Sequence, residues 1–426
     1  MPLLTATLME KIQALKGMRD ILPGEIEQWQ DIEEKARYFF EAHGFEEIRT
    51  PILESTDLFA RSIGEGSDIV HKQMYTFEDR GGRSITLRPE MTASVLRAAL
   101  ENGVLRPSKT SRFYYMGPMF RAERPQKGRQ RQFFQLGAEI LNAKKVEADA
   151  EILVLVQGLL TFLEIPGFQI KHNFLGAENE RQDYIEILKN YFSKAKSQLC
   201  EDCHYRIEKN VLRVLDCKMP GCQPLIAAAP LLKLTAASQE IYDAIRKTLD
   251  ARGIPAAHEP RLVRGLDYYT GLVFEVVAGG DLGSQDAVAA GGRYDNLIAS
   301  LGGPLMGAIG FAAGVERLLL ARQSSSADGS RTVYVAALDA QPETERYLDV
   351  IFKKLYQAGR KVKRDPSVHS LGDQLKKASH LGARYAVIVG EKEVKNQRLT
   401  VKDLVNKSQE EVAVDALAVY LAGRSH

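Results

Sequence analysis

The sequence predicts an α+β protein with several domains, and three observations carry that prediction. Its 426 residues are enough for roughly three domains of about 150 residues each. Two β-favouring runs, 113–120 and 132–140, flank a loop rich in Arg, Lys, Gly and Pro, which is typical of a β-hairpin. Helical patterns dominate residues 171–260, whereas strands alternate with helices after residue 331, as in a small separate α/β domain.

Composition limits the classes of partner. Lys and Arg total 57 against 55 Asp and Glu, so the net charge predicts neither a nucleic-acid nor a membrane partner. No apolar run approaches the roughly 18 residues that span a bilayer. Glu10 and Lys11 stand where a signal peptide would continue its apolar region. We therefore expect a cytoplasmic protein without a membrane partner, and seek any nucleic-acid partner in local patches.

The first predicted elements are a core-facing helix and an edge strand. Apolar residues recur at helical spacing from Trp29 to Phe40, and Gly44 supplies the C-cap. Residues 44–58 then alternate like a strand as far as Pro51. Because proline cannot donate to a strand ladder, this strand should lie at a sheet edge or, alternatively, at a dimer surface.

A strand-to-helix corner follows strand 84–87. Pro89 sits well as the first residue of a helix that stops near Gly103. At this corner Glu90 has two interpretations that periodicity cannot separate. It complements the helix dipole, or Glu90 and Thr92 present a carboxylate and a hydroxyl to a ligand ammonium.

The loop of the predicted hairpin is the clearest candidate for binding a polyanion. Between residues 121 and 131 the single acid is Glu123, against five cations: Arg121, Arg124, Lys127, Arg129 and Arg131. Guanidinium groups bind phosphate through paired hydrogen bonds, although a solvated surface hairpin is the plainer alternative. Gln135 and Glu139 on the return strand are an even number of residues apart, so they share one face of the sheet. This shared face favours a binding site over a solvated surface hairpin.

A predicted apolar helix, 149–165, leads into the helical region 171–260, which we interpret as an inserted module with helices near 184–196 and 236–251. The module contains four cysteines spaced C-x2-C, thirteen residues, C-x4-C: Cys200, Cys203, Cys217 and Cys222. This spacing resembles that of tetrahedral zinc sites. Buried free thiols and the relic of a metal site are the alternatives, so the metal stays unknown.

Further candidate binding and catalytic residues lie after the inserted module. Arg264, Tyr268 and Tyr269 stand just before a predicted strand, and Arg317 lies on an otherwise apolar helix. A charge on a buried helix is costly without a dedicated partner, and the adjacent Glu316 is one candidate. Arginines from three distant segments suit the clamping of a triphosphate. The sequence has no GxxxxGK[ST] loop, so any ATP site must be of another design.

The last part of the chain predicts a small α/β domain after a polar linker at 323–331. A final helix is expected from Ala413, after these strands and helices: strands 332–338, 361–364, 385–389 and 398–401, and helices 343–358 and 371–379. Residues 353–364 contain six cations and no acid, with Tyr356 among them. A solvated face is the usual explanation, and single-stranded nucleic acid is the alternative ligand.

Three stretches resemble motifs of the histidyl-tRNA synthetases. FRAERPQKGRQRQFFQLGAE (120–139) is similar to the second class II motif, LVRGLDYYTGLVFEV (262–276) to the histidine-specific motif, and GAIGFAAGVERLLL (307–320) to the third class II motif. TPILE, LRPEMT and AAGGRYDNL match as well, and the resemblance covers essentially the whole chain. It implies a homodimer with an antiparallel-sheet class II catalytic core (1–170 and 261–322), an inserted helical domain (171–260) and a C-terminal α/β anticodon-binding domain (331–426).

The resemblance also implies substrates and residue roles. ATP, with Mg²⁺, would be held by Arg121 at the α-phosphate and Arg317 at the γ-phosphate, with Glu123 and Arg129 beside them. Arg264 would stabilise the pentacoordinate state. The residues implied for L-histidine are those of an ammonium pocket and those facing the imidazole: Glu90, Met91, Thr92 and Gln135 for the ammonium, and Glu139, Tyr268 and Tyr269 for the ring. Met91 stands where many relatives have a small residue. The family's catalytic pattern gives no support for zinc at the cysteines.

The implied activity is that of a histidine–tRNA ligase, which forms histidyl-adenylate and then esterifies the terminal ribose of its tRNA. The alternative is a synthetase-like, non-catalytic regulatory subunit of ATP phosphoribosyltransferase. Such relatives typically lack the C-terminal domain and erode the active site. A pure nucleic-acid-binding protein would need the basic loop but not Glu90, Gln135 and Glu139.

Overall fold

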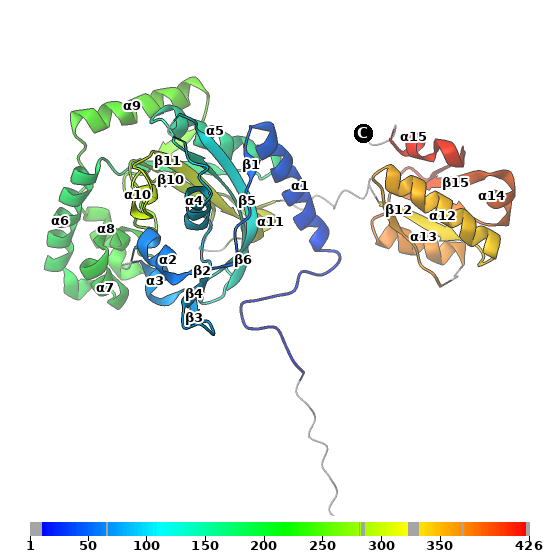
Figure 1. The fold of residues 1–426 in the computed structure, drawn as a ribbon, viewed down its shortest axis with the longest axis horizontal. Helices are drawn as coiled ribbons and strands as arrows, with labels where there is room; N and C mark the ends of the chain where they lie inside the picture. Colours follow the sequence, from blue (N-terminus) through cyan, green and yellow to red (C-terminus); the bar gives the residue numbers. More distant parts are fainter. Residues whose placement is uncertain are drawn as a thin grey trace, which may run out of the picture. The chain divides into compact units, whose positions relative to one another are not determined.

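The computed structural model describes residues 11–64, 67–106, 108–280, 282, 286–322, 332–367 and 370–422. The chain divides into two compact units, Met1–Gln323 and Ser324–His426 (Figure 1). The predicted linker 323–331 and Glu10 lie outside the described residues. Among the helices that are described, none is long and apolar enough to cross a membrane.

The first unit is organised around an eight-stranded sheet with the order β1-β5-β6-β11-β10-β9-β7-β8. The predicted hairpin is confirmed as β5 (Ser111–Phe120) and β6 (Gln132–Leu141), which pair antiparallel along their whole length. All neighbouring strands are antiparallel except the outermost pairs, β1 with β5 and β7 with β8. The predicted antiparallel-sheet core is therefore confirmed.

The edge position of the first strand is confirmed, but its predicted length is wrong. Strand β1 is only Glu46–Glu47, at the edge of the large sheet. Pro51 lies between it and β2 (Leu53–Ser55), which belongs to a separate three-stranded sheet with β4 (Ser84–Leu87) and β3 (Tyr75–Glu78). The core-facing helix before it is α1 (Ile26–Ala42). Because proline has no N–H to donate, the chain leaves one sheet there and enters another.

The corner after β4 also differs from the prediction. Helix α4 is Thr92–Glu101, so Pro89 lies before the helix rather than at its first position. The carboxylate of Glu90 accepts hydrogen bonds from the backbone N–H groups of Thr92 at 2.7 Å and Ala93 at 3.0 Å. Glu90 thus satisfies amides that a helix start leaves without partners, which delays the first helical turn until Thr92.

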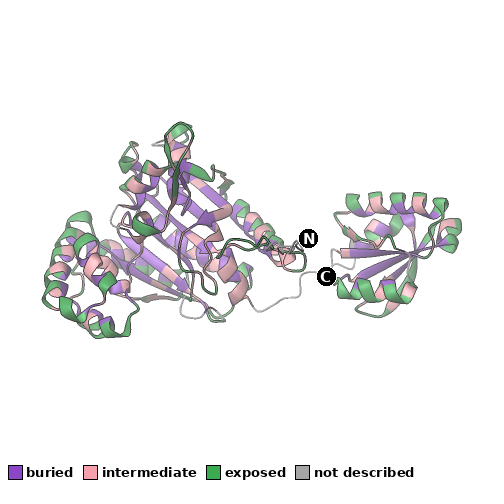
Figure 2. Ribbon diagram, turned by 90° about the horizontal axis from the view of Figure 1, so that it is seen from below, coloured by how far each residue is buried: buried purple, intermediate pink, exposed green. Residues whose placement is uncertain are grey.

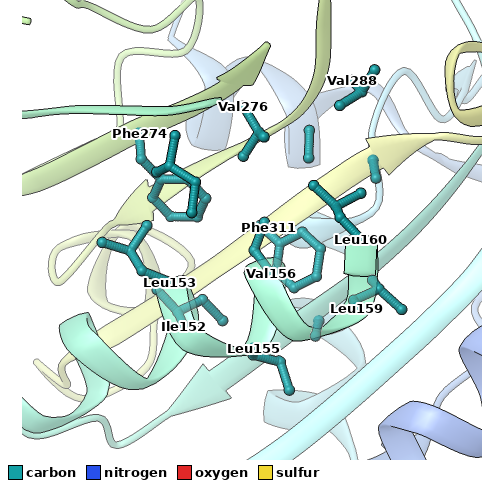
Figure 3. Close-up of a cluster of buried hydrophobic side chains, with 14 of the residues drawn as sticks. Ile152, Leu153, Leu155, Val156, Leu159, Leu160, Phe274, Val276, Val288 and Phe311 are labelled. Atoms are coloured by element: carbon teal, nitrogen blue, oxygen red, sulfur yellow. The ribbon is translucent and has the colours of Figure 1, made fainter. Parts of the chain in front are cut away.

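The main core lies between the large sheet and helix α5 (Glu147–Phe162), which confirms the predicted apolar helix. Leu153, Val156 and Leu160 of α5 pack against side chains of three strands (Figure 3): β9 (Leu272–Val277), β10 (Ala287–Arg293) and β11 (Ala308–Gly314). At the start of α5, the buried Asp149 pairs with Arg293 of β10 at 2.8 Å. This buried pair fixes the helix on the sheet that carries the cavity described below.

The segment 171–260 begins and ends in strands of the large sheet. These strands are β7 (Gln169–Phe174) and β8 (Ala256–His258). Between them lie the two expected helices, α6 (Glu178–Lys194) and α9 (Ala236–Ala251), and two further helices that were not predicted, α7 (Glu201–Lys209) and α8 (Gln223–Ala228). Helix α9 contributes Tyr242, Ile245 and Leu249 to the main core. After β10 and β11 come the short helices α10 (Leu297–Ser300) and α11 (Val315–Ala321).

The second unit is a five-stranded sheet in the order β13-β12-β14-β15-β16, and its strands are buried between helices with exposed outer faces (Figure 2). The strands are β12 (Thr332–Ala337), β13 (Lys361–Lys363), β14 (Tyr385–Val389), β15 (Arg398–Asp403) and β16 (Ser408–Ala413). The helices are α12 (Pro342–Gln357), α13 (Leu371–His380), α14 (Glu391–Asn396) and α15 (Leu417–Ala422).

The predicted final helix from Ala413 is present as α15 but begins later, at Leu417, after a 3-10 turn at Val414–Ala416, and the strand before it, β16, was not predicted. Asp403 accepts the backbone N–H groups of Val405 and Asn406, both at 2.9 Å, and this turn sends β16 back along β15. In the basic segment 353–364, Arg364 pairs with Glu345 at 2.6 Å and Lys354 with Asp415 at 2.7 Å. These two cations are therefore partnered within the unit, while Lys353 and Lys363 are exposed.

Candidate active site

A cavity in the first unit brings together most of the residues predicted from the sequence. Its lining comes from β6, β10, β11, the start of α4, the hairpin loop and the loop before β9. The predicted residues that line it are Glu90, Thr92, Arg121, Glu123, Arg129, Gln135, Arg264, Tyr268, Tyr269 and Arg317. Segments more than two hundred residues apart in the sequence therefore meet at one site.

Two predicted residues are not in this lining. Met91 is buried, and its sulfur accepts a hydrogen bond from Thr50 Oγ1 at 3.2 Å. Glu139 has a fully buried side chain that bonds to cavity-lining hydroxyl groups. Both lie one layer behind the surface that a ligand would contact.

Glu139 is the centre of a buried hydrogen-bond network. It accepts from Thr92 Oγ1 at 2.7 Å, from the Tyr115 hydroxyl at 3.4 Å, and from the Tyr294 hydroxyl. Burial raises the pKa of Glu139 to about 8, against the opposing effect of these hydrogen bonds. An acid with this pKa is largely protonated at neutral pH in the empty cavity.

Tyr115 and Tyr294 also line the cavity, and the sequence reasoning assigned them no role. Tyr115 faces Gly137 across the β5–β6 pair, and Tyr294 directly follows β10. Burial raises the pKa of both phenols well above the usual value, so both remain hydroxyl donors. The motif AAGGRYDNL was the signal for Tyr294, and alternation along β5 was the signal for Tyr115.

Glycine at position 310 is required by this network. Strand β11 pairs Gly310 with Glu139 of β6, and a Cβ at position 310 would overlap the Glu139 carboxylate. At Gly137, a Cβ would lie 2.5 Å from the Tyr115 hydroxyl. The small residues of the two strands thus leave the volume that the acid and the phenol occupy.

Glu90 and Gln135 offer acceptors next to this network. Burial raises the pKa of Glu90, although the backbone N–H groups of Ala93 and Thr92 oppose that shift. Both interpretations of Glu90 hold, because it caps α4 and also lines the cavity. Gln135 Oε1 is buried with no hydrogen-bond partner in the described part of the chain. A buried acceptor without a partner is costly, so a ligand donor would satisfy it.

Two arginines in the cavity form hydrogen bonds only with neutral groups among the residues that the structure describes. Arg121 Nε donates to the Pro89 carbonyl at 2.9 Å, and its guanidinium lies 5.3 Å from the Phe133 ring centre. Arg317 donates to the carbonyls of Gly128 at 3.0 Å and Ala287 at 2.7 Å. Neither forms an ion pair with a carboxylate in the described residues. Burial lowers the pKa of both, and the charges of Arg129 and Arg121 add to this for Arg317.

The other predicted charges are paired. Arg264 Nη1 donates to Glu275 Oε2 at 2.6 Å, and Arg129 pairs with Glu123. Glu316 does not pair with Arg317. Its carboxylate instead accepts the backbone N–H of Phe134 at 3.0 and 3.1 Å, and burial raises its pKa to about 7. The cavity therefore combines paired and unpaired arginines.

The tyrosine pair closes one side of the cavity. The rings of Tyr268 and Tyr269 lie 4.7 Å apart, and Tyr268 contacts the Tyr294 ring edge-to-face at 5.6 Å. Gly292 of β10 has φ +159°, and a Cβ there would lie 2.9 Å from the Tyr269 ring. The glycine pair noted in the sequence thus makes room for Tyr269.

Comparison with known proteins gives a consistent assignment. A family model described as histidyl-tRNA synthetase matches residues 17–318, and one described as an anticodon binding domain matches residues 332–424. The histidine–tRNA ligase of Desulfatibacillum aliphaticivorans is 43% identical over 410 residues, which cover 95% of this chain and 97% of that protein.

Solved structures agree. The crystal structure of apo S. aureus histidyl-tRNA synthetase has a TM-score of 0.75 and 32% identity, covering 96% of this chain and 100% of that one. An ATP phosphoribosyltransferase regulatory subunit/histidyl-tRNA synthetase from Bacillus halodurans C has a TM-score of 0.63 at 22% identity, covering 90% and 98%, and this likeness concerns the fold alone. With the family model matching most of its length and a relative 43% identical across nearly all of it, the chain belongs to the histidyl-tRNA synthetase family.

Proposed function

We propose that the cavity activates L-histidine with ATP to form histidyl-adenylate and pyrophosphate, and that histidine is then transferred to the terminal ribose of its tRNA. The observation that carries this proposal is one cavity lined by Glu90 and by two half-buried arginines that form no carboxylate ion pair among the described residues, with Glu139 hydrogen-bonded behind it. The arginines suit a polyphosphate. The acids suit an ammonium and an imidazole, which both donate hydrogen bonds.

For ATP, we assign Arg121 to the α-phosphate and Arg317 to the γ-phosphate, because both are cations without a carboxylate partner. Arg264 stabilises the charge that develops on the α-phosphorus as the histidine carboxylate displaces pyrophosphate. Its ion pair with Glu275 holds the guanidinium in a fixed orientation before substrate arrives. Arg129 and Glu123 form the outer part of the nucleotide site.

For histidine, we assign Glu90, Thr92 and Gln135 to the ammonium and Glu139, Tyr268 and Tyr269 to the imidazole. Three hydroxyl groups that donate to Glu139 belong to residues that also line the cavity: Thr92, Tyr115 and Tyr294. The position of Glu139 therefore determines where these hydroxyl groups meet the ligand. A site that hydrogen-bonds a substrate rejects analogues lacking those groups by roughly 10⁴–10⁵, because its own polar groups would remain unpaired. Met91 forms the wall behind the ammonium.

Further assignments belong to the same proposal. Mg²⁺ would enter with ATP, held mainly by phosphate oxygens with Glu123 as a nearby carboxylate, and would neutralise phosphate charge. The active form is a cytoplasmic homodimer. Residues 1–170 and 261–322 form the catalytic domain, 171–260 the inserted domain, and 331–426 the domain that binds the anticodon of the histidine tRNA.

The test is ATP–pyrophosphate exchange with each of the common amino acids in turn. We expect histidine alone to drive exchange above background. Equal background signal with all amino acids would exclude the proposed activity. A regulatory subunit is not favoured, because the cavity keeps Arg121, Arg264 and Arg317, and residues 332–424 match the anticodon-binding family model.

A further inference from the structure

The four cysteines, which are all the cysteines of the chain, come together within the segment 171–260. Cys200 immediately precedes α7 and Cys203 lies in its first turn. Cys217 follows a short 3-10 helix, and Cys222 ends another. Their sulfur atoms all lie within 4.8 Å of one another, and none of the four lines the cavity described above.

The spacing of these sulfurs matches the coordination sphere of a single ion. With a Zn–S distance of about 2.3 Å, two sulfurs of a tetrahedral site lie about 3.8 Å apart. The Sγ atoms of Cys200 and Cys217 are 3.8 Å apart. All four side chains are free cysteines, and only Cys200 is even partly exposed. Four free thiols that converge in this way leave the sulfur atoms at the distances that one shared cation requires.

Backbone N–H groups donate hydrogen bonds to two of the sulfur atoms, as they do around metal-bound thiolates. The N–H of Cys200 donates to Cys222 Sγ, and the N–H of Met219 donates to Cys217 Sγ, both at 3.4 Å. Such N–H···S bonds orient sulfur ligands and stabilise their negative charge.

We propose that Cys200, Cys203, Cys217 and Cys222 bind one Zn²⁺ ion in a closed structural site. Thiolate ligands in a tetrahedral arrangement select zinc or iron over harder cations. With all four positions filled by sulfur, no position is left for water or substrate, so the ion would stabilise structure and take no part in the reaction.

The segment that the metal would fix supports the histidine motif. Between Cys203 and Cys217, Arg206 pairs with Asp68 at 3.1 Å, and Asn210 bonds to Asp267. Asp267 is directly followed by Tyr268 and Tyr269. The ion would therefore anchor a loop that packs behind the tyrosine pair of the cavity.

Metal analysis of the purified full-length protein tests this proposal without any activity assay. We expect about one zinc per chain in protein expressed with zinc in the medium. Cys203→Ser should reduce the zinc content to near zero. The matched control is Val214→Ala, which truncates another buried side chain of the same segment but no ligand, and should keep about one zinc.

Cobalt binding to the wild-type protein gives a second measurement, which does not depend on whether any variant folds. Wild-type protein stripped with a chelator and titrated with Co²⁺ should develop the absorption of a tetrahedral cobalt–thiolate centre, saturating at about one equivalent and reversed by Zn²⁺. Protein that carries no zinc and gives no such absorption would overturn the proposal. So would four thiols that a thiol reagent modifies equally fast with and without Zn²⁺, or disulfides among them.

Discussion

Acidic and basic residues of the cavity are held in different ways. In the acidic cluster, Glu90 and Glu139, hydrogen-bond donors already surround each carboxylate: two backbone amides for Glu90, and three hydroxyls for Glu139. In the cationic cluster, Arg121, Arg264 and Arg317, two of the three guanidinium groups have only carbonyl or aromatic groups as hydrogen-bond or ring partners within the described part of the chain. The acids are oriented before the ligand arrives, whereas the cations keep positive charge that awaits an anion.

The difference follows from the ligands proposed for each cluster. Burying a neutral, protonated Glu139 costs little free energy. Its hydrogen-bond network fixes the positions of the polar groups that would recognise an imidazole. Partly buried cations without a carboxylate ion pair among the described residues are costly, and burial lowers the pKa of Arg121 and Arg317. That cost is recovered only when a polyanion enters, which couples the stability of this part of the site to ATP binding.

The largest effect is expected at Arg264 of the cationic cluster. Arg264→Ala should reduce the rate of ATP–pyrophosphate exchange by about 10²–10³, because one preoriented cation is lost from the transition state. Affinity for tRNA, measured by filter binding, should stay close to wild type. This asymmetry would separate a role in chemistry from a role in general phosphate binding.

The control for Arg264 is Arg246→Ala, which removes an exposed arginine of α9 that lies outside the cavity. Exchange and tRNA binding should both be unchanged in this variant. If Arg264→Ala lost exchange and tRNA binding to the same extent, the assigned role would be wrong.

The next largest effect is expected where the acidic cluster meets β11. Gly310→Ala places a Cβ on the Glu139 carboxylate and must displace it. We expect the KM for histidine to rise by about 10²-fold with little change in the KM for ATP, because the imidazole partner moves while the arginines do not. Steady-state exchange with each substrate varied in turn measures both constants.

Gly314→Ala on the same strand is the matched control for Gly310. A Cβ there meets its nearest atom, Arg317 Cδ, at an ordinary contact distance of 3.8 Å. The KM for histidine should stay near the wild-type value in this variant. A similar rise in both variants would show that added volume at either glycine of β11 disturbs histidine binding, and would remove Glu139 from the explanation.

The same two clusters show what the sequence could predict. The alternation of β6 was enough to place Gln135 and Glu139 on one face, and the basic loop was visible from composition. Both are local properties of one hairpin. The burial of Glu139 behind Tyr115 and Tyr294 was not predictable, because it depends on how β6 pairs with β11 and where β10 ends, and these contacts join residues more than a hundred positions apart.

Two departures from the sequence prediction, at the start of α4 and at β16, have local causes. Pro89 suits the first position of a helix, but the Glu90 side chain binds the first amides of α4 and moves the start to Thr92. Strand β16 (Ser408–Ala413) was not predicted, because the Asp403 side chain forms the turn that returns the chain to the sheet. In both places a side chain that bonds the backbone decides the local structure.

A smaller effect is expected at Arg317. Arg317→Lys keeps the charge but loses the planar group that bonds the Gly128 and Ala287 carbonyls. We expect the KM for ATP to rise about tenfold, equivalent to about 1.4 kcal/mol. In the same helix region, Arg322→Lys alters an ion pair with Glu164 outside the cavity, and should leave the KM for ATP unchanged. An unchanged KM in Arg317→Lys would mean that only charge matters at this position.

A last effect, on stability and not on kinetics, tests whether Glu139 is protonated in the folded protein. Burial raises the pKa of Glu139 to about 8, above the value near 4.5 of an exposed glutamate. The folded state therefore holds a proton that the unfolded state releases, and the stabilising contribution falls as the pH rises from about 4.5 through about 8, by at most about 1.4 kcal/mol per pH unit. Glu139→Gln cannot ionise, so its free energy of unfolding in urea should fall less steeply than wild type between pH 6 and pH 8.5. Parallel pH profiles for the two proteins would mean that Glu139 is already ionised when folded, and that both clusters carry charge before the substrates bind.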